Sequence, residues 1–283
     1  MRNLTVDIGG RHLRYVRAGT ASTHPLIVLE CGAYGCAADW AVVQEKLALR
    51  GLASLAYDRA GLGYSDAGPK PRDGHAIAHD LEALLAGLNE PGPVVLVGHS
   101  MAGILIRVFV ARNTEKVSGL VLVDAVTSQA VENPVIARAI GRFISVMKLL
   151  ARGTGLGLMR PAAWIAGDTI GLAGEARAEK KAIFGSGRHM RGATDELSQW
   201  IETSAQGRAS GPYDPALPIA VVTAGRASPL KALQAAPALA SHHGYVDHVA
   251  GANHASLLGR RFADPIIAGV EHVLSITSRQ APG

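Results

Sequence analysis

The chain has 283 residues, of which 48% are hydrophobic and 18% charged, with a formal net charge of +5 and a pI of about 9.4. This length allows one large domain with an insertion, and the apolar content is sufficient for a sizeable core. The basic residues are scattered, and the only adjacent basic pairs are Lys180-Lys181 and Arg260-Arg261. Because nucleic-acid binding needs basic residues clustered on one face, we expect no nucleic-acid partner.

Cysteine content and hydropathy narrow the class further. Cys31 and Cys36 form neither a disulfide framework nor a zinc-binding pattern, so we interpret them as small loop residues. The first residues lack the continuous apolar segment of a signal peptide. The most apolar run, residues 94–110, is interrupted by Gly98-His99-Ser100 and Arg107 and does not form a membrane span. We therefore expect a cytoplasmic protein with no membrane partner, and its oligomeric state is left open.

Short runs rich in Val, Ile and Leu alternate with longer helix-like stretches along most of the chain. This alternation is typical of βαβ units and predicts an α/β fold with a parallel sheet. The uniformly apolar runs fit strands that are covered on both faces, and Gly9-Gly10 indicates an opening hairpin. The predicted strands are residues 4–8, 13–18, 26–30, 53–57, 94–97, 120–123, 219–223 and 245–249, and the predicted helices outside the insertion are residues 39–49, 75–88, 101–112 and 264–275.

The segment from about Thr127 to Pro212 departs from this alternation. It is rich in Ala, Gly and Arg, has no convincing strand, and shows helical apolar spacing at residues 135–150 and 176–184. Its aliphatic content, with Trp164 and Trp200, argues against a disordered linker. We predict a core domain of residues 1–127 and 213–283, and a helical cap of residues 128–212 inserted over the sheet.

Residues 94–103, Val-Val-Leu-Val-Gly-His-Ser-Met-Ala-Gly, carry the strongest local motif. An apolar strand leads into Gly-x-Ser and then into a helix start, which is the pattern of a nucleophile elbow. The turn requires small neighbours of Ser100, and Gly98 and Ala102 provide them. A serine that only caps the helix is the alternative interpretation. The strand before and the helix after favour a nucleophile, with the Met101 N–H placed to stabilise an oxyanion.

A serine nucleophile requires a base, which in this arrangement follows late in the chain. His254 lies in a Gly-containing loop after the last predicted strand, from which it can reach over the sheet edge toward Ser100. His242 and His243 fall in a polar connection, and His248 falls within the strand itself. Position therefore favours His254 over these three competitors.

Four segments together resemble the α/β-hydrolase superfamily. Residues 26–32 followed by Trp40 resemble its oxyanion-loop region, and residues 57–65 resemble its Asp-x-x-Gly-x-Gly-x-Ser turn. Residues 98–103 resemble the nucleophile elbow and residues 251–254 the histidine loop. The resemblance extends over nearly all the chain outside the insertion, and it implies an eight-stranded, mostly parallel sheet with a helical cap.

The oxyanion loop departs from the common family pattern. The family commonly has His-Gly after its third strand, whereas this chain has Glu30-Cys31-Gly32-Ala33. Because backbone N–H groups stabilise the oxyanion, this change need not abolish the site, and the resemblance places the N–H groups of Ala33 and Met101 there. Glu30 would be costly if it were buried without a partner, and we expect it to pair with Arg59.

The acid of the triad is also missing from its usual place. The loop after the seventh strand, residues 223–229, contains no carboxylate. The family has an alternative site at the end of the sixth strand, where this chain has Asp124. An ionised carboxylate there would hold the His254 tautomer and stabilise the imidazolium. Asp124 could instead be a helix or turn cap, and Asp247 is the rival acid.

These residues predict a serine hydrolase of carboxylic esters, with Ser100, His254 and Asp124 as the catalytic triad. A serine argues against the dehalogenase and epoxide-hydrolase branches of the family, which attack with aspartate at that position. Lactones, thioesters and amides or peptides are alternative substrates of the same machinery. Two other classes stay open: a non-hydrolytic ligand receptor, and a cofactor-free lyase, oxygenase or perhydrolase.

The cap is expected to select a small, largely hydrophobic substrate. The side chains predicted to bind it are Phe143, Met147, Met159 and Trp164. No cofactor or metal is expected: Gly61-Leu62-Gly63 lacks the spacing of a nucleotide fingerprint. His75 and His79 share a helix face, but no acidic pattern suited to zinc accompanies them.

Overall fold

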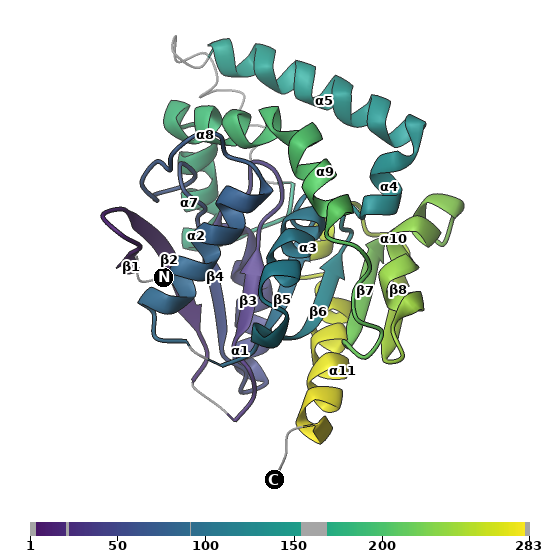
Figure 1. Ribbon diagram of the computed structural model, residues 1–283. Coiled ribbons are helices and arrows are strands. Elements are labelled where there is room, and N and C mark those ends of the chain that lie inside the picture. Colours follow the sequence, from purple (N-terminus) through teal and green to yellow (C-terminus); the bar gives the residue numbers. More distant parts are fainter. Residues whose placement is uncertain (1–3, 21–22, 91, 154–168, 281–283) are drawn as a thin grey trace.

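The computed structural model describes residues 4–20, 23–90, 92–153 and 169–280. One eight-stranded sheet crosses the molecule in the order β1-β2-β4-β3-β5-β6-β7-β8 (Figure 1). β1 pairs with β2, and β2 with β4, in antiparallel fashion, and the remaining neighbours are parallel. The predicted α/β-hydrolase fold and the opening hairpin are thereby confirmed. The strands are β1 (Leu4–Asp7), β2 (His12–Ala18), β3 (Ile27–Glu30), β4 (Ser54–Tyr57), β5 (Val94–His99), β6 (Val117–Val123), β7 (Ile219–Ala224) and β8 (Gly244–Val249).

Helices cover both faces of the sheet because the central strands are apolar on both sides. Successive residues of a strand point to opposite faces, so Ile27 and Leu29 of β3 enter one core cluster and Val28 enters the other. The first cluster includes α1 and α11, and the second includes α2, α3 and α10. These helices are α1 (Ala41–Leu49), α2 (Gly74–Gly87), α3 (Ala102–Arg112), α10 (Pro229–Ala240) and α11 (Asp264–Gln280), and a short 3₁₀ turn (Ala37–Trp40) precedes α1.

Helix α10 is absent from the sequence-based prediction. Its start nevertheless carries a known signal, since Ser228 caps it by accepting a hydrogen bond from the Lys231 N–H (3.3 Å) and Pro229 occupies its first turn. The internal Pro237 weakens the helical pattern. Ala235 and Ala238 are buried, so small side chains carry much of the packing of this helix.

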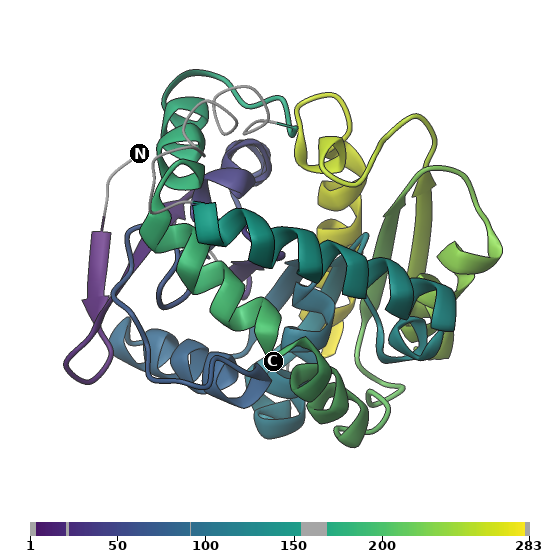
Figure 2. The same ribbon diagram turned by 90° about the horizontal axis from the view of Figure 1, so that it is seen from above.

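Helices occupy the described part of the segment between β6 and β7. They are α4 (Ser128–Glu132), α5 (Pro134–Gly153), α7 (Gly174–Phe184), α8 (Gly187–Ser198) and α9 (Trp200–Ala209). Helices α5 and α8 lie across the carboxyl ends of the strands, as the view from above makes clear (Figure 2). This position is the one expected for a cap, although α8 and α9 were not among the predicted helices. Within the described ranges, no helix is both long and apolar enough to cross a membrane.

The packing of β3 in the core leads to a prediction about the free energy of unfolding. Leu29 of β3 is fully buried, so Leu29→Ala should lower the free energy of unfolding by about 2–5 kcal/mol through lost burial and an unfilled cavity. Leu239, at 72% exposed, is the matched control, and Leu239→Ala should stay within about 0.5 kcal/mol of wild type. Urea denaturation measures both, and an unchanged midpoint for Leu29→Ala would contradict the packing described for this strand.

Candidate functional site

Ser100 occupies the sharp turn between β5 and α3 with a left-handed backbone, φ 59°. Two hydrogen bonds hold this turn: the Ser100 N–H donates to the Val123 carbonyl (3.1 Å), and the Val126 N–H donates to the Ser100 carbonyl (2.9 Å). A Cβ on Gly98 would lie 2.3 Å from Ile106 Cδ1, so a larger residue here would require the Ile106 side chain to move. The turn thus places the Ser100 hydroxyl at the carboxyl edge of the sheet.

The imidazole of His254 reaches Ser100 from the loop after β8. His254 Nε2 lies 2.9 Å from Ser100 Oγ, and His254 Nδ1 lies 2.6 Å from Asp124 Oδ2. An ionised carboxylate only accepts hydrogen bonds, so Nδ1 carries the proton and Nε2 accepts the serine hydroxyl. The three residues predicted as a triad are therefore brought together in one hydrogen-bonded chain.

Asp124 is 4% exposed at the end of β6 and also has a left-handed backbone, φ 42°. Its second oxygen, Oδ1, accepts hydrogen bonds from Lys231 Nζ (2.6 Å) and from the Ala224 N–H (3.2 Å). Burial alone would raise the pKa of Asp124. The hydrogen bonds from His254 and Lys231, with the charge of Lys231, outweigh burial and hold the pKa well below its usual value. Asp124 is therefore a carboxylate anchored from both sides.

The rival residues lie elsewhere. Asp247 is within β8, paired with Val222, and in the described part of the chain no hydrogen bond joins it to His254. His248 Nδ1 lies 2.6 Å from the hydroxyl of Thr223 on β7. His242 and His243 precede β8, where the His242 N–H donates to the Pro215 carbonyl and the His243 N–H donates to Ser241 Oγ.

The loop after β3 lies directly against Ser100. A Cβ on Gly32 would lie only 2.8 Å from Ser100 Cβ, so glycine permits this close approach. The next residue, Ala33, lines the same cavity as Ser100, and Met101 is the N-cap residue immediately before α3. Among the described residues, no hydrogen bond uses the N–H of Ala33 or of Met101. Both donors are therefore available to a ligand.

The Glu30–Arg59 ion pair expected behind this loop is confirmed. Arg59 Nη1 lies 2.6 Å from Glu30 Oε1, and both side chains are almost completely buried. Tyr57 also donates its hydroxyl proton to Glu30. Burial raises the pKa of Glu30, and the guanidinium of Arg59 opposes this effect.

The Ser100 hydroxyl opens into a cavity of about 460 Å³, within the usual range for small-molecule sites. Phe143 and Met147 of α5 line it, as predicted, and the Tyr34 ring meets Phe143 edge-on at 6.3 Å. Met159 and Trp164 lie outside the described residues. The lining is completed by Gly32, Ala33, Tyr34, Gly35, Asp39, His99, His254, Thr169, Ile170, Lys180, Phe184, Ala255 and Leu258.

His99 and Lys180 are site residues that sequence reasoning missed. His99 Nε2 donates to the His254 carbonyl (2.9 Å), and the two rings lie 4.5 Å apart. Burial, with the charge of His254, lowers the pKa of His99 to about 3, so this side chain is a neutral support for the histidine loop. Lys180 lies in the cavity wall and binds both carboxylate oxygens of Asp39. The position of His99 inside the serine motif was the one available signal.

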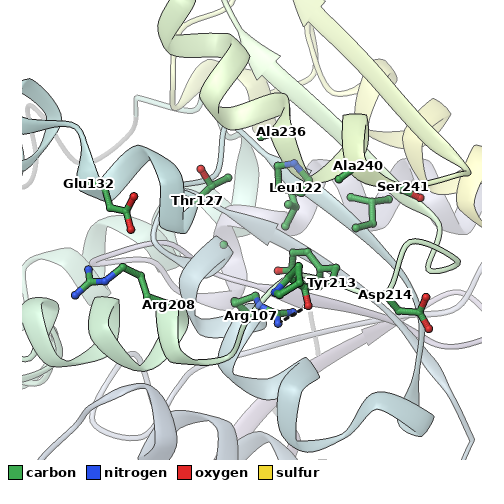
Figure 3. Close-up of a pocket in the computed structure, with 15 residues that line it drawn as sticks. Arg107, Leu122, Thr127, Glu132, Arg208, Tyr213, Asp214, Ala236, Ala240 and Ser241 are labelled. Carbon is green, nitrogen blue, oxygen red and sulfur yellow. Dashed lines mark hydrogen bonds between the residues drawn. The ribbon is translucent and has the colours of Figure 1, made fainter.

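A second cavity, of about 400 Å³, lies between α3, α10 and the connection into β7 (Figure 3). The Arg107 guanidinium lies 4.2 Å from the centre of the Tyr213 ring and donates to the Pro212 carbonyl (2.8 Å). Burial raises the pKa of Tyr213 to about 12, so it stays a neutral phenol. None of these lining residues is Ser100, His254 or Asp124. Arg107 joins α3 to the segment before β7 through its contacts with Pro212 and Tyr213, so we assign this region a structural role.

The described residues offer no cluster of three or more His, Cys, Asp or Glu side chains arranged to hold a metal. Cys31 and Cys36 are both buried and free, and Cys31 Sγ lies 3.1 Å from the Cys36 carbonyl oxygen. Burial raises the pKa of each thiol well above its usual value, which disfavours the thiolate form that metals require.

Comparison with known proteins agrees with the fold described above. Residues 25–142 match the family model described as alpha/beta hydrolase fold. An esterase from Thermogutta terrifontis superposes with a TM-score of 0.71 at 19% identity, covering 97% of this chain and all of that one. A Vigna radiata epoxide hydrolase superposes with a TM-score of 0.75 at 14% identity, covering 96% and 98%. These likenesses show that the chain has the α/β-hydrolase fold.

Sequence relatives match only in part. An AB hydrolase superfamily protein of Gibberella zeae is 34% identical over 110 residues, 38% of this chain and 34% of that protein. An uncharacterized protein of Schizosaccharomyces pombe is 35% identical over 97 residues, 34% of this chain and 17% of that protein. An uncharacterized vacuolar membrane protein of Saccharomyces cerevisiae is 33% identical over 106 residues, 36% of this chain and 16% of that protein. The matched region thus spans about a third or less of each of these relatives.

The two candidate acids can be separated by paired substitutions. Asp124→Asn should lower turnover by about 10⁴-fold, because the amide no longer holds the His254 tautomer or stabilises the imidazolium. Asp247→Asn is the matched control and should keep turnover within about threefold of wild type. Steady-state hydrolysis of a chromogenic ester measures both, and the opposite ranking would move the acid to Asp247.

A buried histidine of α8 predicts how stability depends on pH. His189 is fully buried, its Nδ1 accepts the Gly63 N–H (3.1 Å) and its Nε2 lies 3.2 Å from the Tyr34 carbonyl oxygen. Burial, with the charge of Lys180, lowers its pKa to about 3 in the folded chain, against about 6.5 when unfolded. The unfolded chain therefore binds this proton first as the pH falls, and folded stability is lost below about pH 6.5.

From pH 7 to pH 5, this side chain should remove about 2 kcal/mol from the free energy of unfolding. His189→Gln lacks the titrating group, so its loss between these two pH values should be smaller than that of wild type by about this amount. Denaturant titrations at pH 7 and pH 5 measure the difference. Equal losses in wild type and variant would show that His189 is not held neutral.

Proposed function

We propose that this hydrolase-fold protein is a serine hydrolase that cleaves carboxylic esters through an acyl-enzyme on Ser100. The observation that carries the proposal is the chain Ser100 Oγ–His254 Nε2 (2.9 Å) and His254 Nδ1–Asp124 Oδ2 (2.6 Å) at the mouth of a cavity. These distances are those of a nucleophile hydrogen-bonded to a base that a third group orients.

In the proposed reaction, Ser100 Oγ attacks the ester carbonyl carbon while its proton passes to His254 Nε2. The carbonyl oxygen gains negative charge and accepts hydrogen bonds from the N–H groups of Ala33 and Met101. As the tetrahedral intermediate collapses, the bond to the alkoxy oxygen breaks and His254 returns the proton to the leaving alcohol. Water then attacks the acyl-enzyme by the same steps in reverse order, releasing the carboxylic acid and free Ser100.

The electrostatics of the site support this chemistry. Asp124 stays ionised near neutral pH because Lys231 and His254 donate hydrogen bonds to its two oxygens. Its charge stabilises the imidazolium that forms when His254 takes the serine proton. His99, stacked beside His254, stays neutral and so adds no repelling charge to this imidazolium.

The cavity wall supports a substrate with an apolar acyl or alcohol part. Phe143, Met147, Ile170, Phe184 and Leu258 form most of its apolar lining. Among the lining residues that the structure describes, Lys180 is the one Lys or Arg, and it is paired with Asp39 at 2.7 Å. A substrate that carries its own charge would find no free counter-charge among these described lining residues, so neutral esters are favoured.

A fluorophosphonate probe tests the proposal directly. Wild type should be labelled on one serine, and labelling should disappear in Ser100→Ala while Ser65→Ala, which changes a buried serine away from the cavity, keeps it. Turnover of 4-nitrophenyl esters should fall by about 10⁴-fold or more in Ser100→Ala. Wild type that resists labelling would instead favour a ligand receptor or a cofactor-free enzyme of another type.

Chromogenic esters of increasing chain length, tested beside lactones, thioesters and anilides, then define the substrate class. Short to medium apolar acyl chains should give the highest kcat/KM, since the cavity of about 460 Å³ holds a molecule of that size. Faster turnover of anilides than of the matched esters would assign the protein to amide bonds.

A further inference from the structure

Arg59 uses every N–H of its guanidinium at the carboxyl edge of the sheet. Its Nη1 donates to the Cys31 carbonyl (2.5 Å) and to Glu30 Oε1 (2.6 Å), and its Nη2 donates to the Gly32 carbonyl (3.0 Å) and to Glu196 Oε2 (2.7 Å). Its Nε donates to Glu196 Oε1 (2.9 Å). Five acceptors thus meet five donors around a side chain that is 2% exposed.

The hydrogen bond to Gly32 acts on the neighbouring residue through the peptide plane. The Gly32 carbonyl and the Ala33 N–H belong to one planar trans peptide group, so they point in opposite directions. With the carbonyl fixed on Arg59, the Ala33 N–H points away from Arg59. Ala33 itself lines the cavity that contains Ser100. The guanidinium therefore favours the orientation in which the Ala33 N–H, and not the Gly32 carbonyl, faces the cavity.

Within its own loop, this peptide group is held by a turn in which the Gly35 N–H donates to the Gly32 carbonyl (3.2 Å), and Arg59 adds to this local support. Gly32 has no Cβ to restrict rotation, and a Cβ is excluded by Ser100 at 2.8 Å. A rotated peptide group would present a carbonyl oxygen instead of an N–H to the developing oxyanion, and two negative oxygens would then repel each other. Holding the carbonyl on a cation prevents that rotation.

The support extends into the helices inserted between β6 and β7. Glu196 of α8 is 3% exposed and holds Arg59 with both carboxylate oxygens. On the same loop, the Tyr34 carbonyl lies within hydrogen-bond distance of His189 Nε2 of α8 (3.2 Å), and Lys180 of α7 binds Asp39. The loop that carries Ala33 is therefore held by the inserted helices as well as by the core.

From this geometry we infer that Arg59 is a positioning residue for the oxyanion hole, and that Glu196 couples the inserted helices to it. The inference rests on the serine hydrolase mechanism proposed above. Arg59 touches neither substrate nor Ser100; it acts through the Gly32–Ala33 peptide group. An arginine suits this task because its fixed fork can bind two carbonyls and two carboxylates at once, which a lysine cannot do.

The test compares Arg59→Met, Arg59→Lys and Glu196→Gln with Arg72→Lys as the matched control. Arg72 is also a buried arginine paired with a buried carboxylate, Asp80 at 2.7 Å, and belongs to neither the loop nor the cavity. We expect kcat to fall about 100-fold in Arg59→Met, with a smaller fall in Arg59→Lys and Glu196→Gln, because one oxyanion donor is worth about 10²–10³ in kcat. KM should stay within about threefold, since the ground-state ester is bound elsewhere.

Inhibitor affinities distinguish positioning from general loss of structure. An alkyl boronic acid forms a tetrahedral adduct on serine and needs the oxyanion hole, so its affinity should fall in parallel with kcat. The affinity for the product alcohol should stay within about threefold, and Arg72→Lys should retain wild-type kcat and boronate affinity. Thermal unfolding identifies any variant that fails to fold. If Arg59→Met does not fold, Arg59→Lys and Glu196→Gln provide the test.

Wild-type kcat and boronate affinity in folded Arg59→Lys and Glu196→Gln would overturn the inference while leaving the proposed function intact. A parallel loss of boronate and alcohol affinity would also overturn it, because that result indicates a disordered cavity. Wild type that reacts with neither fluorophosphonate nor boronate would refute the proposed function, and the inference with it.

Discussion

The backbone at the carboxyl edge of the sheet is forced into a left-handed conformation at two adjacent strand ends. Ser100 follows β5 with φ 59°, and Asp124 follows β6 with φ 42°. Each such residue costs of order 1–3 kcal/mol unless its surroundings fix it. Here the Ser100 N–H binds the Val123 carbonyl, and the Asp124 N–H binds the Val222 carbonyl of β7 (2.7 Å), so each strand end is held by the next strand. Without that stack of parallel strands, neither side chain would project toward His254.

At the carboxyl edge of the sheet, some buried ionisable side chains are charged and paired, and others are held neutral. Asp124 is kept ionised by Lys231, whereas His99 and His189 are kept neutral by burial. Arg59, a buried cation behind the oxyanion loop, meets two carboxylates. A buried charge is tolerated only when it is paired and hydrogen-bonded, and Asp124 and Arg59 both meet that condition. In the proposed mechanism, the charge that changes is therefore on His254, whose side chain is 54% exposed.

The sequence allowed prediction of those parts that depend on local pattern. Apolar runs located the strands, and the glycine-serine turn located Ser100, because both are set by neighbours in the chain. The position of Asp124 at a strand end was foreseen, but its partner Lys231 was not, since α10 is small, proline-interrupted and packed through alanines. The Arg59–Glu196 contact joins residues 137 apart. No pattern of neighbouring residues indicates this pairing, because Glu196 reaches Arg59 only after the inserted helices have folded onto the core.

Lys180, His189 and Glu196 join the inserted helices to the core, and these contacts limit how the cavity could be redesigned for another ligand. Inserted helices that only cover a cavity can be replaced as a unit, because the core beneath them does not depend on their side chains. In this chain, the exchanged segment would take with it the carboxylate that holds Arg59 and the ammonium that holds Asp39. A grafted segment would therefore have to reproduce those three side chains at the same places, or the loop beneath it would lose its anchors. New specificity in this protein is more accessible through single changes at Phe143 and Met147, which face the cavity from α5 and take no part in that support.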